Sequence, residues 1–110
     1  MARLRMADIL ESMMGAARES LGEDWPRGRD YAKLELKKLA QSLIDITRLA
    51  ATGKINRQQA QALLQIHRNT TLTVMLTVEG LGVIAVENAI NAALTAVREV
   101  VNGVVGWRLV

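Results

Sequence analysis

The sequence has 110 residues, of which half are hydrophobic and 23% are charged, and its formal net charge is +3. This balance is typical of one folded domain over 1–110 and argues against a disordered chain. Cysteine is absent and His67 is the single histidine. The composition therefore excludes disulfides, thiolate metal sites, cysteine nucleophiles and a multi-histidine metal site within one chain.

The charge is shared unevenly between two parts of the chain. Residues 1–71 contain 12 of the 14 basic groups and 8 of the 11 acidic groups. Residues 72–110 contain two arginines and three glutamates and are otherwise very apolar. Near the start, Asp8 and Glu11 interrupt the apolar residues before the hydrophobic region of a signal peptide could form, so we expect a cytoplasmic protein.

The spacing of apolar residues predicts a first helix over 3–21. Gly22 follows at the position where a glycine ends a helix at low cost, because it adopts a left-handed conformation without strain. Asp24 is expected to cap the next helix by accepting a hydrogen bond from a free amide. Pro26 suits the first turn of that helix, where no amide is needed.

A second helix is predicted over 26–51, with apolar residues that step by four and three along one seam. The seam consists of Ala32, Leu36, Leu39, Leu43, Ile46 and Ala50. Leu34, Ile44 and Leu49 lie off this seam and widen the apolar face, which indicates more than one neighbouring helix.

The clearest local signal lies between the second and third helices. Thr52 and Gly53 end the second helix. Asn56 then provides an N-cap, and Gln59 can reach back to it in a capping box. These residues predict two antiparallel helices joined near Gly53.

A third helix begins at Arg57 and is predicted to run over 57–101. A continuous helix of roughly 45 residues would be about 68 Å long, whereas the second helix would span about 39 Å. Continuity is favoured because no N-cap residue follows Gly82, and the alternative is a break at 79–82 that makes a four-helix bundle. A second stripe of small residues would let another helix approach closely. It consists of Gly82, Ala85, Ala89, Ala92 and Ala96.

A β-structure is the alternative for two segments. Residues 71–78 alternate and are rich in β-branched side chains, and Asn102-Gly103 is a hairpin signal within 98–110. The helical pattern of 89–97 joins these segments, so we predict an all-α fold. It comprises an N-terminal helix, an antiparallel helical hairpin, a long apolar C-terminal helix and an apolar tail over 102–110.

The predicted third helix is too long to be covered by the first two helices of the same chain. We therefore expect a helical bundle, with coiled-coil spacing, that self-association completes. On this hypothesis the protein is a homo-oligomer or a protein–protein interaction module and not an enzyme. The expected oligomer interface comprises Leu76, Val83, Val86, Ala89, Ile90, Ala92, Ala93, Val97, Val100, Val104 and Trp107.

Two other functions are weighed against self-association. The apolar segment 72–110 could associate with a membrane, although Glu87 and its asparagine neighbours are costly in hydrocarbon. The basic start of the second helix could bind nucleic acid weakly through phosphates, but interleaved acidic residues favour a solvated face. This basic patch comprises Arg27, Arg29, Lys33 and Lys37.

No catalytic, cofactor or metal site is predicted, and no small-molecule substrate is expected. Glu79 and Glu87 would share one side of a continuous third helix, yet the Glu-x-x-His pattern of di-iron helices is absent. We expect both glutamates to face solvent, or Glu79 to pair with a lysine or arginine of the second helix. His67 is expected to be a structural residue.

Overall fold

The computed structural model describes residues 4–110, and every regular element in that range is helical. The elements are α1 (Met6–Leu21), the 3-10 helix η1 (Gly22–Asp24), α2 (Trp25–Ala51), α3 (Arg57–Met75), α4 (Val83–Ala96) and α5 (Arg98–Val105). The all-α prediction is confirmed for this part of the chain, where neither the 71–78 strand nor the 98–110 hairpin forms.

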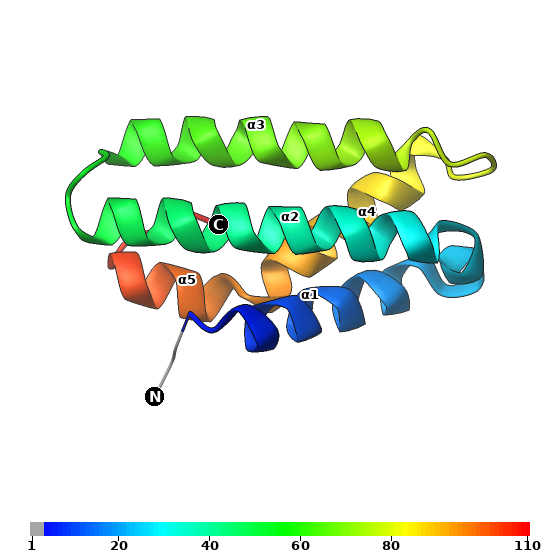
Figure 1. Cartoon of the computed structure of the whole chain (residues 1–110), viewed down its shortest axis with the longest axis horizontal. Helices are drawn as coiled ribbons and strands as arrows, with labels where there is room; N and C mark the ends of the chain where they lie inside the picture. The colour runs from blue at the N-terminus through cyan, green and yellow to red at the C-terminus, as the bar shows by residue number, and fades with distance from the viewer. Residues whose placement is uncertain (1–3) are drawn as a thin grey trace.

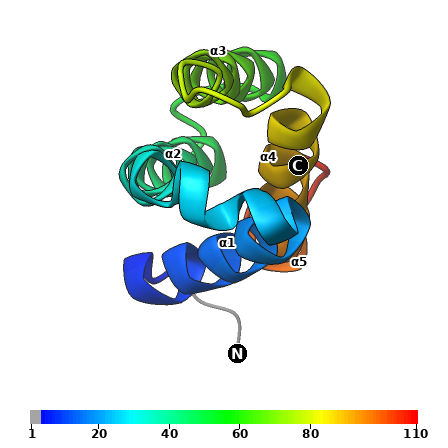
Figure 2. The same cartoon turned by 90° about the vertical axis from the view of Figure 1, so that its right-hand side faces the viewer.

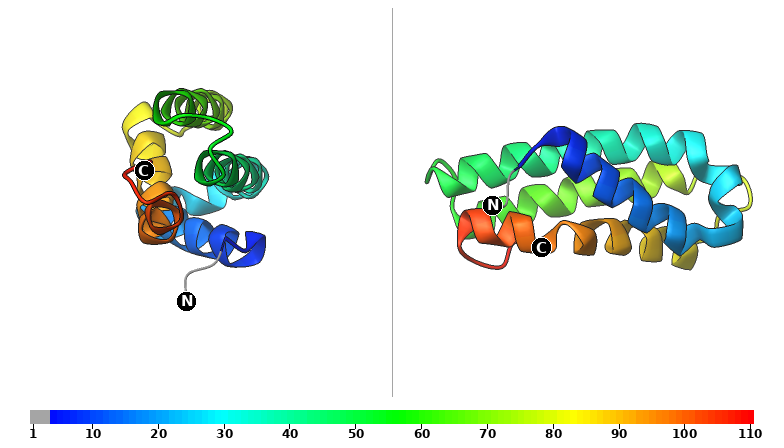
Figure 3. Two further views of the ribbon diagram at one scale, coloured as in Figure 1. Left: turned by 90° about the vertical axis from the view of Figure 1, so that its left-hand side faces the viewer. Right: turned by 90° about the horizontal axis from the view of Figure 1, so that it is seen from below.

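The helices surround one apolar core in an elongated molecule of 42 × 27 × 18 Å. α2 and α3 run antiparallel side by side, and α1 lies along the opposite side of α2 (Figure 1). α4 and α5 follow one another along the molecule (Figure 3). α4 packs on α1 and α3, and α5 packs on α2. Seen from one end, α3, α2 and α1 form three levels, and α4 covers one side of them (Figure 2).

α1 places one apolar residue per turn in the core, and these residues are Ile9, Met13, Ala17 and Leu21. Gly22 ends α1 with a positive φ of 54°, as expected of a glycine, but its ψ of −117° differs from that of the left-handed conformation expected there. The expected Asp24 cap is wrong, because η1 gives this residue a helical backbone instead of the extended one that a capping side chain needs. Its carboxylate accepts a hydrogen bond from Arg27 Nη1 at 3.4 Å.

α2 buries the predicted seam from Ala32 to Ile46, with Ala50 half-buried at its end. Ile44 is also buried, as expected of a wider apolar face. Leu34 and Leu49 are exposed instead, because α1 and α3 flank α2 and leave its remaining side to solvent. The apolar face of α2 is therefore narrower than the sequence indicates.

The predicted capping box at the start of α3 is present. Asn56 Oδ1 accepts a hydrogen bond from the Gln59 amide at 2.7 Å, and the Asn56 amide donates to Gln59 Oε1 at 2.9 Å. These two bonds satisfy amides that the first turn of a helix leaves without partners. The α2–α3 hairpin is thus fixed by residues close together in sequence.

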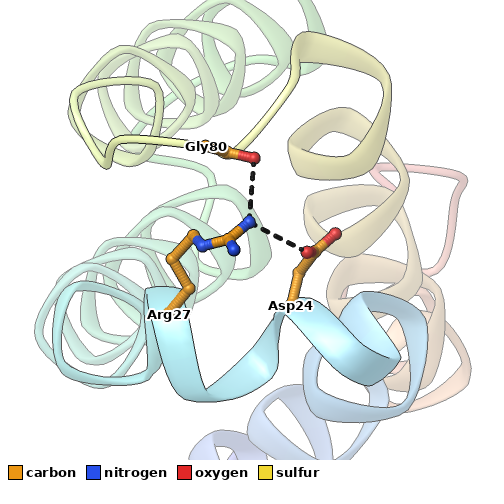
Figure 4. Close-up of polar contacts among 3 residues, drawn as sticks. All are labelled: Asp24, Arg27 and Gly80. Carbon is orange, nitrogen blue, oxygen red and sulfur yellow. Dashed lines mark hydrogen bonds and ion pairs between the residues drawn. The ribbon is translucent and has the colours of Figure 1, made fainter.

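The continuous helix over 57–101 is wrong, because α3 ends at Met75 and α4 starts at Val83. Gly80 adopts φ of 89° in the connecting loop, which only glycine adopts readily. Val78 and Leu81 are buried although they belong to the loop, so its apolar side chains are not left in water. Arg27 Nη1 donates to the Gly80 carbonyl oxygen at 3.3 Å and ties the loop to α2 (Figure 4).

The small residues of α4 pack within the chain. Ala89 and Ala93 are buried, and α4 packs more extensively on α1 than any other pair of helices in the described chain does. Ala17 of α1 is also buried and lines the same part of the core as Ala89. Close approach of two small-residue surfaces was expected, but the second surface belongs to α1 of the same molecule.

The expected apolar tail over 102–110 comprises the end of α5 and a short segment that folds back onto Asn102. α5 ends at Gly106, whose φ is 82°. Asn102 Oδ1 accepts hydrogen bonds from the Leu109 and Val110 amides at 2.9 and 3.0 Å, and its Nδ2 donates to the Val110 oxygen at 3.2 Å. The Leu109 side chain is buried as a result.

Candidate functional site

The residues expected to form an oligomer interface do not form one surface. Five of them are buried within the chain, namely Val86, Ala89, Ile90, Ala93 and Val97. Four are half-buried, namely Leu76, Ala92, Val100 and Trp107. Val83 and Val104 are exposed but lie on different helices. Because folding of a single chain already covers the inner face of α4, that face is not available to a second copy.

The polar residues singled out in the C-terminal part are also separated. Glu79 lies in the α3–α4 loop and is exposed, whereas Glu87 lies on α4 and is half-buried, so they do not share a helix face. Neither glutamate forms an ion pair within residues 4–110, which leaves the expected pairing of Glu79 unrealised. In the same range, no cluster of three or more potential ligands for a metal ion occurs.

Exposed apolar and basic side chains meet on the solvent side of α2. Tyr31 is 47% exposed and Leu34 is 54% exposed, and their spacing of three residues places them on adjacent turns of one face. Lys37 and Lys38 lie one turn after Leu34, Lys33 lies at the edge of this face, and all three are exposed. We call these five residues the α2 outer face. Asp30 joins Tyr31 and Leu34 in lining a shallow hollow of about 300 Å³ on this face.

The four residues of the predicted basic patch have different partners. Arg27 lies between the Asp24 carboxylate and the Gly80 carbonyl, and Arg29 Nε is 3.6 Å from Asp30 Oδ1. Within the described residues, Lys33 and Lys37 form no ion pair. Each of the two arginines thus has an intramolecular partner, although both side chains remain largely exposed. The two lysines have no such partner in the described chain and are also exposed.

A polar groove runs between α2 and α3 next to the α2 outer face. It measures about 240 Å³ and is lined by Glu35, Lys38, Leu39, Ser42, His67, Thr70 and Thr71. Glu35 is only 2% exposed, and its Oε2 lies 3.1 Å from Lys38 Nζ. A buried carboxylate is costly without a partner, so Lys38 holds this ion at the base of the groove. His67 is half-buried at the groove wall.

A wide, open hollow lies at the other end of the molecule, around the α5 C-terminus. Arg98, Asn102, Trp107 and Arg108 are among its lining residues. The Arg57 guanidinium stacks over the Trp107 ring at 4.9 Å from the ring centroid. This cation–π contact joins α3 to the segment after α5 and gives Trp107 a structural role.

Two features of these candidate surfaces were not predicted from the sequence. Tyr31 was not considered, and Leu34 was assigned to an apolar face that packs on a neighbour. On a helical wheel Leu34 lies among Lys37, Lys38 and Gln41, and such polar neighbours are typical of a solvent-exposed helix face. Glu35 shares its side of the helix with the seam residues Ala32 and Leu39, and that spacing could have indicated its burial.

Within the described residues, no helix combines the length and the apolar character needed to traverse a bilayer. Comparison with known proteins finds no matching family model, no matching curated protein and no matching solved structure.

Proposed function

We propose that the protein is a non-enzymatic helical interaction module that binds an acidic, apolar partner helix on the α2 outer face. The observation that carries this proposal is the exposure of Tyr31 and Leu34, adjacent large side chains among lysines. Covering exposed apolar side chains with a partner stabilises the complex by roughly 25 cal/mol per Å² of apolar surface removed from water. A patch of this kind with a polar rim is typical of an interaction site.

The charge around the patch selects the kind of partner. Lys33 and Lys37 form no ion pair within residues 4–110, so a carboxylate on the partner could pair with either of them without displacing an ion pair in that range. Complementary charge accelerates association and rejects partners of the same sign. An amphipathic helix with leucines on one side and glutamates beside them meets both requirements, because it offers apolar and acidic groups at helical spacing.

Nucleic-acid binding is the weaker hypothesis for the same surface. Phosphate contacts need several available cations, whereas Arg27 and Arg29 are already engaged with groups of their own molecule. The Leu34 side chain would also contribute no binding free energy to a phosphate contact, because a phosphate group has no apolar surface to bury. The dependence of binding on Leu34 therefore discriminates between the two partners.

The proposal is tested by titrating isotope-labelled protein with a synthetic helical peptide that carries leucines on one face and glutamates elsewhere. NMR shift changes are expected to concentrate on the α2 outer face. Leu34→Ala should weaken binding about tenfold, because a central apolar contact contributes on the order of 1–2 kcal/mol. Ile66→Ala is the matched control, since Ile66 is 59% exposed but lies on α3.

Equal weakening by both substitutions, or shift changes spread away from α2, would contradict the proposed site. A parallel titration with single-stranded and duplex DNA addresses the nucleic-acid hypothesis. Strong, salt-sensitive DNA binding that Leu34→Ala leaves unchanged would replace the protein partner with nucleic acid.

A further inference from the structure

α1 presents a face whose charge is opposite to that of the α2 outer face. Asp8, Glu11, Gly15 and Glu19 are all exposed, and their spacing of three, four and four residues places them on one side of the helix. The exposed Arg18 lies at the edge of this side, where three carboxylates outnumber its one guanidinium. This side lies opposite the buried residues of α1, such as Met13 and Ala17. We call these four residues the α1 outer face.

We propose that the partner of the α2 outer face is a second copy of this chain, which binds through its α1 outer face. This inference rests on the proposed function and names the acidic helix that the α2 outer face accepts. It places the contact between copies on the outward sides of α1 and α2. The buried side of α4, where the sequence predicted the contact, takes no part in it.

The two faces do not neutralise one another within a single molecule. Of the three carboxylates on the α1 outer face, only that of Asp8 forms an ion pair within the described chain, and its partner is Arg5. Glu11 and Glu19 form none there, and neither do Lys33 and Lys37. Asp8 and Lys38 thus have partners within their own molecule, whereas the other two charges on each face have none in the part of the chain described and are complementary in sign.

The α1 outer face is long enough to accommodate the α2 outer face. Asp8 and Glu19 are eleven residues apart, which is about 16 Å along a helix, and Tyr31 to Lys38 spans about 10 Å. Gly15 lies at the centre of the α1 outer face, and no atom stands within 4 Å of the place where a side chain would begin. A helix carrying Tyr31 and Leu34 can therefore approach α1 closely at this point.

The first test measures self-association of the full chain by sedimentation equilibrium at low and high salt. The dissociation constant should rise by about tenfold between about 50 mM and about 500 mM NaCl, because salt screens exposed ion pairs. A protein that stays monomeric at every attainable concentration in low salt would overturn the proposal.

The second test reverses each face separately. The pair Lys33→Glu and Lys37→Glu makes both faces acidic, and the pair Glu11→Lys and Glu19→Lys makes both faces basic. Each double variant should be monomeric on its own, because like charges then meet. An equimolar mixture of the two should associate again, because each acidic face then meets a basic one. Failure of the mixture to associate, with wild-type protein associating normally, would overturn the assignment of the faces.

A matched control carries Lys54→Glu and Arg98→Glu, which changes the net charge as much as the first pair but at exposed positions outside both faces. It should associate like the wild type, and its loss of association would show an effect of net charge alone. The peptide titration described above tests the proposed function independently of self-association. If the peptide binds the α2 outer face while the chain stays monomeric, the proposed function stands and self-association is wrong.

Discussion

The Cδ1 atom of Leu81 lies 2.8 Å from the point where a Cβ atom on Gly28 would stand. Leu81 belongs to the loop between α3 and α4, and Gly28 lies in the first turn of α2. The missing side chain at position 28 therefore makes room for the loop to pack on α2. Arg27, one residue earlier, binds the same loop through the Gly80 carbonyl.

This packing predicts strong coupling between positions 28 and 81. In a Leu81→Ala background, Gly28→Ala should stabilise the protein by up to about 1 kcal/mol, because alanine favours a helix more than glycine does. In the wild-type background the new methyl group must displace Leu81, and the gain should be cancelled or reversed. Urea unfolding of the four proteins measures the coupling free energy. A value near zero would mean that Leu81 moves aside freely.

The close packing of α4 on α1 predicts a large effect of added volume at Ala89. Ala89→Leu should destabilise the protein by about 1–3 kcal/mol, because the larger side chain forces the two helices apart. Ala96→Leu is the control, since Ala96 lies on the same helix but is exposed, and its effect should be small. The half-buried Ala92 should give an intermediate result. Thermal unfolding followed by circular dichroism measures all three, and equal midpoints would contradict the packing.

The hydrogen bonds of Asn102 predict local opening of the last residues when they are removed. Asn102→Ala deletes three bonds to Leu109 and Val110, so exchange of these two amides should accelerate about tenfold or more. Asn102→Asp keeps the two acceptor bonds and should exchange more slowly than the alanine variant. Hydrogen exchange followed by NMR gives both rates. Unchanged protection in Asn102→Ala would show that burial of Leu109 alone holds the segment.

The buried carboxylate of Glu35 predicts a specific dependence on Lys38. Lys38→Met removes its ion-pair partner and should cost on the order of 1 kcal/mol, a modest value because Lys38 itself is largely exposed. Adding Glu35→Gln should restore the lost stability, because the amide carries no charge. Lys37→Met is the matched control on the adjacent residue. Denaturant unfolding measures the free energy of unfolding of each variant. If Lys37→Met and Lys38→Met lower it equally, the ion pair is not a stabilising contact.

Sequence reasoning predicted the structures that depend on neighbouring residues. The capping box of Asn56 and Gln59 and the glycine stop at Gly22 are determined within a few positions, and both are present. The break between α3 and α4 was considered only as the alternative to a continuous helix, because the apolar spacing continues through it. Its stabilising contacts come from α2, about fifty residues earlier, and helical periodicity contains no information about them.

The candidate site was predicted only in part, for a similar reason. The lysines of the basic patch were found because charge is visible in the sequence. The exposure of Tyr31 and Leu34 was missed, since an apolar residue on a helix is equally compatible with a neighbour or with water. That distinction requires knowing that α1, α3 and α5 pack on α2 and that nothing in the described chain covers the side that carries Tyr31 and Leu34.

The pairing of α1 with α4 has a consequence for how the chain folds during synthesis. The α2–α3 hairpin connects neighbouring segments and can form as soon as it leaves the ribosome. α1 can pack on α2 early, but its most extensive partner, α4, lies some seventy residues downstream and emerges much later. Throughout that interval the side of α1 that α4 covers is open to solvent, so the nascent N-terminal helix is exposed to premature apolar contacts.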